Sequence, residues 1–110
     1  MSRKNEGTNG NENAEAPILL RLFTAGNAPN SLEAQANLKA ICSECLSPGE
    51  YQLEVVDVLE EPLRALEDGV LVTPTLIRHA DAPLSVVGTL SDHEKVKQAL
   101  GLEKKESSGQ

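Results

Sequence analysis

The chain has no tryptophan and only two aromatic residues, Phe23 and Tyr51, among its 110 residues. Because proteins hold single-stranded nucleic acids by stacking bases on several aromatic side chains, this scarcity argues against a base-stacking platform. Basic residues are also in the minority, with 10 Lys and Arg against 17 Asp and Glu, which gives a formal net charge of −7. This excess of negative charge would repel a phosphate backbone, so we expect no nucleic-acid partner.

Long apolar runs are missing as well. No segment approaches the ~20 consecutive apolar residues that cross a bilayer, so we expect no membrane partner. The N-terminal segment MSRKNEGTNGNENAEA lacks the hydrophobic stretch of a secretory signal, which favours a cytoplasmic protein. Thiols usually stay reduced in the cytoplasm, and we therefore expect no structural disulfide between the two cysteines.

The ends of the chain differ in composition from its middle. Residues 1–16 and 103–110 are almost entirely polar and cannot bury enough surface to offset the entropy of ordering. We predict a disordered tail at each end. Residues 17–102 alternate short apolar runs with amphipathic stretches, which predicts a single α/β domain.

The first half of this domain is predicted to form a βαβ unit. Residues 18–23, ILLRLF, are a nearly continuous apolar run, which is typical of a central strand in a parallel sheet. A helix is predicted to start near Ser31, behind a capping box of Asn30 and Glu33, and to end at Pro48-Gly49. Residues 51–59, YQLEVVDVL, are rich in β-branched side chains and predict a second strand parallel to the first.

The second half is predicted to add a short helix, a hairpin and a final helix. The short helix covers residues 62–67, and strands at 76–78 and 84–87 form an antiparallel hairpin. Pro74 leads into the first of these strands, and its peptide bond is compatible with either the cis or the trans form. Ser91 and Glu94 resemble a capping box for a helix that ends at Gly101 and turns three residues inward: Val96, Ala99 and Leu100.

Cys42 and Cys45 form a C-x-x-C motif, CSEC, like that of thiol–disulfide oxidoreductases. In thioredoxin-like enzymes the reactive cysteines sit between the first strand and the first helix, where the helix dipole stabilises a thiolate. Here residues 27–30, NAPN, occupy that position, and the cysteines lie near the end of the predicted helix. They share its apolar stripe with Ala34, Leu38 and Ile41.

We therefore favour a packing role for both cysteines and no catalytic residue. A thioredoxin-like thiol–disulfide oxidoreductase that uses Cys42 and Cys45 remains the alternative function. A zinc site is not expected, because only His79 and His93 remain as usual nitrogen donors for a metal that needs about four ligands. We expect no metal and no cofactor.

The predicted order βαβαββα is that of the thioredoxin fold, and several segments carry a more specific pattern. These are Ala25-Gly26-Asn27 with Pro29-Asn30-Ser31, Asp57-Val58-Leu59, Thr73-Pro74-Thr75-Leu76, and Gly88 with Leu90-Ser91. In order and spacing they resemble the KaiB family of circadian clock proteins over about residues 18–100. The sequence departs from the family pattern at Thr89, where Asp is usual, and at Pro83, which stands alone where a run of prolines is common.

The resemblance implies a non-catalytic regulator that binds the ring-shaped ATPase KaiC and modulates its phosphorylation and ATPase cycle. It also implies a second, metamorphic arrangement of the C-terminal half in a self-associating ground state, as a dimer or a tetramer. Residues 60–100 contain no aromatic residue to favour one core, which is compatible with two packings. The residues expected in the fold-switch region are Gly88, Thr89, Ser91 and Asp92.

We expect the partner to bind near the start of the first helix and beside the Pro74 segment. The predicted partner-binding residues are Asn27, Ala28, Pro29, Asn30, Thr73, Pro74 and Thr75. The alternative is that Gly26, Pro29 and Asn30 merely form the turn and the helix cap. A KaiB-like sensory input domain of a histidine kinase is a third possibility, which the absence of a kinase segment in this sequence argues against.

Overall fold

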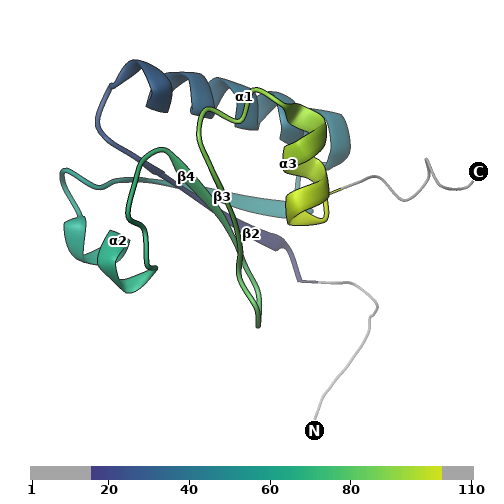
Figure 1. Ribbon diagram of the computed structural model, residues 1–110. Helices are drawn as coiled ribbons and strands as arrows, with labels where there is room; N and C mark the ends of the chain where they lie inside the picture. Colours follow the sequence, from purple (N-terminus) through teal and green to yellow (C-terminus); the bar gives the residue numbers. More distant parts are fainter. Residues whose placement is uncertain (1–15, 103–110) are drawn as a thin grey trace, which may run out of the picture.

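The computed structural model describes residues 16–102, which fold into a four-stranded mixed sheet with helices on both faces (Figure 1). The elements are β2 (Ile18–Thr24), α1 (Pro29–Cys45), β3 (Tyr51–Asp57), α2 (Pro62–Glu67), β4 (Thr75–His79), β5 (Leu84–Val87) and α3 (His93–Leu100). The predicted order βαβαββα is confirmed. The tails predicted at 1–16 and 103–110 lie outside the described residues, except for Ala16.

The strands lie in the order β3-β2-β4-β5, so β3 and β5 are the edges. Strand β2 is parallel to β3 and antiparallel to β4, and β5 is antiparallel to β4. The parallel pair confirms the predicted βαβ unit, since α1 makes the crossover between its strands. Helices α1 and α3 cover one face of the sheet and α2 covers part of the other (Figure 1).

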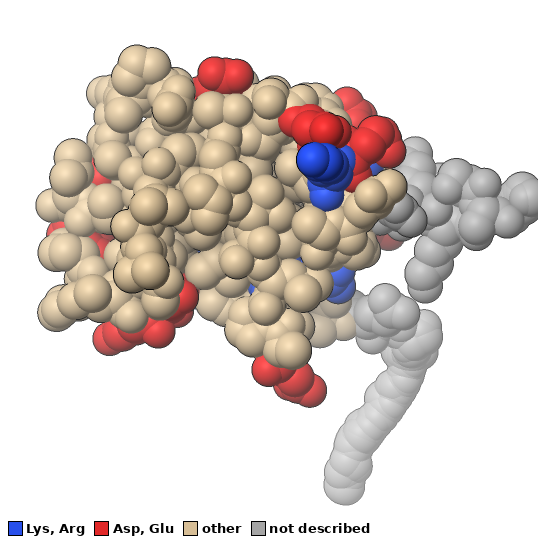
Figure 2. Space-filling view, in the orientation of Figure 1, with Lys and Arg blue, Asp and Glu red and all other residues tan. Residues whose placement is uncertain are grey.

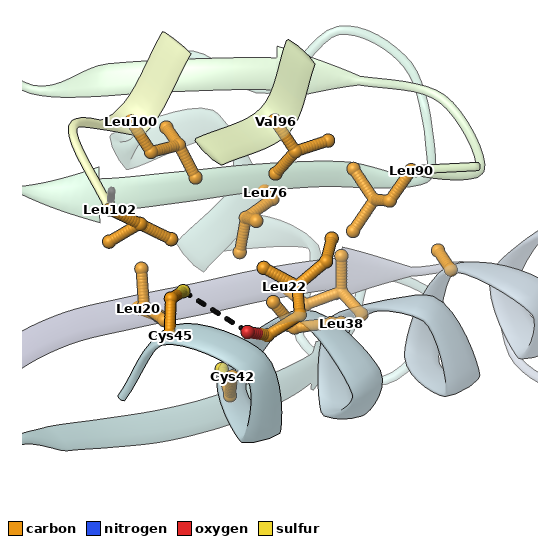
Figure 3. Packing of buried hydrophobic residues seen from close by; sticks show 12 residues of the cluster. Leu20, Leu22, Leu38, Cys42, Cys45, Leu76, Leu90, Val96, Leu100 and Leu102 are labelled. Atoms are coloured by element: carbon orange, nitrogen blue, oxygen red, sulfur yellow. Dashed lines mark hydrogen bonds between the residues drawn. The ribbon is translucent and has the colours of Figure 1, made fainter. Parts of the chain in front are cut away.

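The larger core lies between the sheet and the helices α1 and α3 (Figure 3). The stripe predicted for α1 is confirmed, because all of its members are buried: Ala34, Leu38, Ile41, Cys42 and Cys45. Residues from the sheet, from α3 and from the segments flanking α3 complete this core: Leu20, Leu22, Leu76, Leu90, Val96, Leu100 and Leu102.

A smaller core lies on the opposite face, beneath α2. Its buried members are Phe23, Val56, Ala65 and Ile77, with Val58 and Val70 packed against them. Helix α2 has six residues and buries only one of them, Ala65. This face of the sheet is therefore covered by a short helix that contributes little apolar surface of its own.

Helix α1 begins at Pro29, two residues before the predicted start, and the predicted capping box of Asn30 and Glu33 is wrong. Ala28 is the N-cap and makes no side-chain cap bond. Proline suits the first helical position because its missing N–H has no partner there and its φ is already helical. The Ser31 hydroxyl is buried and accepts a hydrogen bond from the Ala25 N–H at 3.0 Å, which holds the preceding loop against the helix.

Helix α3 begins at His93, and the predicted capping box of Ser91 and Glu94 is also wrong. Asp92 is the N-cap instead, and its carboxylate accepts from the Lys95 N–H at 3.2 Å. Val96 and Leu100 point inward as predicted, whereas Ala99 is exposed.

The predicted end of α3 at Gly101 is confirmed by its left-handed φ of 67°. The guanidinium of Arg78 on β4 donates to the carbonyls of Leu100 and Gly101, at 2.7 and 3.3 Å. These bonds satisfy carbonyls that have no partner within the helix.

Replacing Leu38 by alanine should lower the free energy of unfolding by about 2–5 kcal/mol, because Leu38 is fully buried in the larger core. The matched control is Leu71→Ala. Leu71 is 91% exposed, so its truncation should change stability by less than about 0.5 kcal/mol. Urea denaturation followed by circular dichroism measures both, and equal losses in the two variants would contradict the described packing.

Candidate docking surface

The two segments predicted to bind a partner meet at one end of the sheet. Residues 27–30 follow the carboxyl end of β2, and residues 73–75 lead into β4, which runs antiparallel to β2. Phe23 is paired with Thr75 in that ladder, so both segments lie at the same end. The sequence was compatible with a cis or a trans bond between Thr73 and Pro74, and the bond is cis.

The predicted fold-switch residues begin at the same end of the sheet. The Gly88 N–H donates to the Pro74 carbonyl at 2.9 Å, and the Thr89 carbonyl accepts from Asn37 of α1 at 2.8 Å. Leu90 has a φ of 65°, a conformation that few residues other than glycine adopt, and its side chain is buried in the larger core. Burial of Leu90 therefore maintains an unfavourable backbone conformation between β5 and α3.

Asp57 joins the loop after β2 to the loop after β3, at the same end. Its Oδ1 accepts from the N–H groups of Gly26 at 3.0 Å and Leu59 at 2.9 Å. Gly26 has a φ of 56°, and a Cβ there would lie 3.3 Å from the Leu59 side chain. Both loops contain motifs noted in the sequence, Ala25-Gly26-Asn27 and Asp57-Val58-Leu59, but only the structure shows that Asp57 joins these two loops.

Exposed apolar side chains gather on α2 and its flanking loops. We call this set the α2 patch; its members are between 51% and 91% exposed and comprise Leu59, Leu63, Leu66, Leu71 and Val72. Figure 2 shows few charged side chains over this part of the molecule, with acidic groups at its margin. The patch was not predicted from the sequence: α2 contains Leu63 and Leu66, but only the structure shows that its one buried residue is Ala65.

Charges beside the α2 patch are dominated by carboxylates. Glu54 on β3 bridges two arginines: it accepts from Arg64 of α2 at 2.6 Å and from Arg21 of β2 at 2.9 Å. The hydrogen bond from Arg64, followed by that from Arg21, lowers the pKa of Glu54 to about 2. Arg21 also donates to Asp68 at 2.7 Å. Both arginines on this side are thus neutralised by neighbouring carboxylates.

The cysteines lie in the larger core, away from this end of the sheet. Both are buried, and the Cys45 thiol donates to the Ile41 carbonyl at 3.1 Å (Figure 3). Burial, with a smaller contribution from Cys45, raises the pKa of the Cys42 thiol to about 11. Residues 27–30, which occupy the position of the thioredoxin cysteines, carry no thiol. The oxidoreductase alternative therefore has no accessible thiolate to use.

Residues 16–102 form neither a metal-binding cluster of side chains nor a membrane-spanning helix. No group of three or more His, Cys, Asp or Glu side chains in this range is arranged to hold a metal ion. None of the helices in the same range combines the length and the apolar character needed to cross a membrane.

The molecule is thus a thioredoxin-like α/β domain in which a surface of loops and apolar side chains stands where thioredoxins carry reactive cysteines. The KaiB domain family matches residues 21–102, and the chain belongs to this family. The resemblance inferred from the sequence motifs is confirmed.

Two curated proteins are similar to this chain over most of its length. Circadian clock protein KaiB3 of Synechocystis sp. is 46% identical over 87 residues, which cover 78% of this chain and 82% of that protein. Circadian clock oscillator protein KaiB of Prochlorococcus marinus is 44% identical over 91 residues, which cover 82% and 84% of the two chains.

Solved structures confirm the thioredoxin-like fold. The N-terminal domain of Synechococcus elongatus SasA superposes with a TM-score of 0.67 at 23% identity, covering 84% of this chain and 90% of that domain. Fasciola hepatica thioredoxin superposes with a TM-score of 0.64 at 18% identity, covering 82% and 84%. At this level of identity the likeness to thioredoxins concerns the fold alone.

We expect the native thiols to react slowly with Ellman's reagent. With a pKa of about 11, only about one Cys42 thiol in 1,000 is ionised at pH 8, and burial further restricts access. The rate at pH 8 should be at least ~100-fold lower than that of the chain unfolded in denaturant. Because the pKa is raised, the native rate should increase as the pH rises toward 11.

A double variant, Cys42→Ser with Cys45→Ser, provides the functional control. It should keep full partner binding, and the parent chain should not catalyse the reduction of insulin disulfides. A fast native thiol, or loss of function in the double variant without loss of folding, would support the oxidoreductase alternative.

Proposed function

We propose that this protein is a non-catalytic regulator that binds a KaiC-type ATPase and modulates its phosphorylation and ATPase cycle. The observation that carries the proposal is the KaiB-family match across residues 21–102. It is supported by relatives named as circadian clock proteins and by the burial of the only two thiols. In this role the protein acts by occupying a surface of the ATPase.

The proposed docking surface combines the two predicted segments with the α2 patch. Leu59 connects the patch to the β2–α1 loop, because its side chain lies beside Gly26. Val72 connects it to the Pro74 segment, because its carbonyl accepts from the Thr75 hydroxyl at 2.7 Å. Residues 27–30, residues 73–75 and the α2 patch are thereby joined at one end of the domain.

This surface favours a partner with a complementary apolar site bordered by basic residues. Exposed leucines of the α2 patch supply apolar area whose burial favours binding. Glu60, Glu61 and Glu67 lie beside them and are exposed, and the whole chain carries a formal charge of −7. A basic border on the partner would speed association and select the orientation of docking.

We further propose that residues 60–100 can adopt a second arrangement that self-associates as a dimer or tetramer. Several features support this proposal. Helix α2 buries one residue, and none of the four residues of β5 is fully buried. The turn before α3 requires the unusual φ of Leu90. Elements with as little buried surface as α2 and β5 need only a few kcal/mol to favour another packing.

Binding is tested by pull-down with the cognate KaiC-type ATPase, with and without nucleotide. We expect the parent chain to be captured and the double variant Leu63→Glu, Leu66→Glu to bind at least ~10-fold more weakly, because both leucines lie in the proposed interface. The control is Leu84→Glu, on edge strand β5. Failure of the parent chain to bind under either condition would reject the function, and equal loss in the control would reject the surface.

The second arrangement is tested by NMR assignment of residues 60–100, alone and with the ATPase. We expect two different strand and helix maps, one of which matches α2, β4, β5 and α3 as described. Residues 18–57 serve as the internal reference, because the βαβ unit is expected to keep its shifts. A single map under both conditions would reject the rearrangement and leave the binding proposal standing.

A further inference from the structure

A polar cluster joins α3 to α1 on the face of the sheet opposite α2. His93, the first residue of α3, has its ring Nδ1 3.2 Å from Glu44 Oε2 and its ring Nε2 3.2 Å from Asn37 Oδ1. Glu44 and Asn37 both belong to α1. The His93 side chain is 27% exposed and that of Glu44 is 43% exposed. The contact with Asn37 is therefore partly shielded from water, whereas the contact with Glu44 is exposed.

A third contact determines the orientation of the Asn37 amide. Its Nδ2 donates to the Thr89 carbonyl at 2.8 Å. A carbonyl oxygen only accepts hydrogen bonds, so the group facing Thr89 must be the NH₂ and the group facing His93 must be the oxygen. The second neighbour of the ring, the Glu44 carboxylate, is also an acceptor. Both ring nitrogens of His93 therefore face acceptors.

Only the protonated ring satisfies both neighbours. Neutral imidazole carries one N–H, so one of its nitrogens would present a lone pair to an oxygen lone pair. The imidazolium ion carries two N–H groups and donates to Glu44 and Asn37 at once. Its bond to the carboxylate is also charge-assisted, which makes it stronger than a bond between neutral groups.

The other charged groups around the ring are compatible with this arrangement. Lys97 of α3 donates to the second Glu44 oxygen, Oε1, at 2.8 Å and to Glu94 at 3.3 Å. The bond from Lys97, and then that from His93, lowers the pKa of Glu44, which favours its charged form. Lys97 opposes a positive His93, but two carboxylates share its charge. Asp92, the neighbouring N-cap, contributes a further negative charge.

We propose that His93 is a proton-operated latch between α1 and α3. When the ring is protonated it bridges Glu44 and Asn37 and holds the start of α3, with the Thr89 turn, against α1. When it is neutral, one of the two contacts is lost, and α3 is held by its buried side chains, by the Lys97–Glu44 ion pair at 2.8 Å and by the Arg78 cap at its end. Mild acid thus strengthens the docking of α3, and mild alkali weakens it. The latch is independent of the proposed function.

Hydrogen exchange of the α3 amides at pH 5.5 and pH 8.0 tests the latch, after correction for the intrinsic exchange rates. We expect residues 96–100 of the parent chain to be about fivefold to tenfold more protected at pH 5.5. In His93→Gln this difference should disappear, because glutamine does not titrate. His79→Gln, which alters the other histidine of the chain, should keep it.

A second measurement follows the ring itself in the unsubstituted protein. The ¹⁵N shifts of the His93 imidazole should show two protonated nitrogens at pH 5.5, and its titration should coincide with the change in α3 protection. Asn37→Ala, which removes one acceptor, should reduce the pH effect. Equal protection at both pH values, or an undiminished pH effect in His93→Gln or Asn37→Ala, would overturn the proposal.

Discussion

Burial of one stripe of α1 against the central strands is the interaction on which the rest of the structure depends. Leu38 and Ile41 pack into the same core as Leu20 and Leu22 of β2, which aligns α1 along the parallel β2–β3 pair. The stripe continues to the last turn, so Cys42 and Cys45 become part of the core and their chemistry is suppressed. The start of α1 is left at the end of the sheet where the loops of the proposed docking surface lie together.

The helices of the domain differ in how much of each is buried. Helix α1 contributes six buried residues, whereas α2 contributes one and α3 contributes two. Polar contacts therefore matter more in the second half: Arg78 caps the end of α3, and His93 connects its start to α1. Interactions of this kind respond to pH and to binding partners more readily than a close-packed core does. This contrast connects the proposed rearrangement with the proposed latch.

The order of the elements was predictable because apolar runs and helical stripes are properties of the local sequence. The same holds for the two cysteines, whose spacing on the stripe placed them inside the core. The helix starts were not predictable from capping preference, since Asn30 is a better N-cap than the Ala28 that is used, and Ser91 is as suitable as Asp92. The exposure of the α2 patch could not be predicted from the sequence either, because it depends on how much of the sheet is covered by so short a helix. Ala99 was misplaced for a related reason: only two residues of α3 itself, Val96 and Leu100, are buried.

The salt bridges of Glu54 have a consequence for the behaviour of the protein at high concentration. Glu54 lies on β3, an edge strand whose outer main-chain groups have no neighbouring strand in the described fold. Edges of this kind are templates for aggregation, and charged side chains protect against it because a like-charged strand cannot approach them. The hydrogen bond from Arg64 lowers the pKa of this carboxylate to about 2, so Glu54 keeps its charge in mild acid. An edge strand of the sheet thus carries an ionised side chain over a wide range of pH.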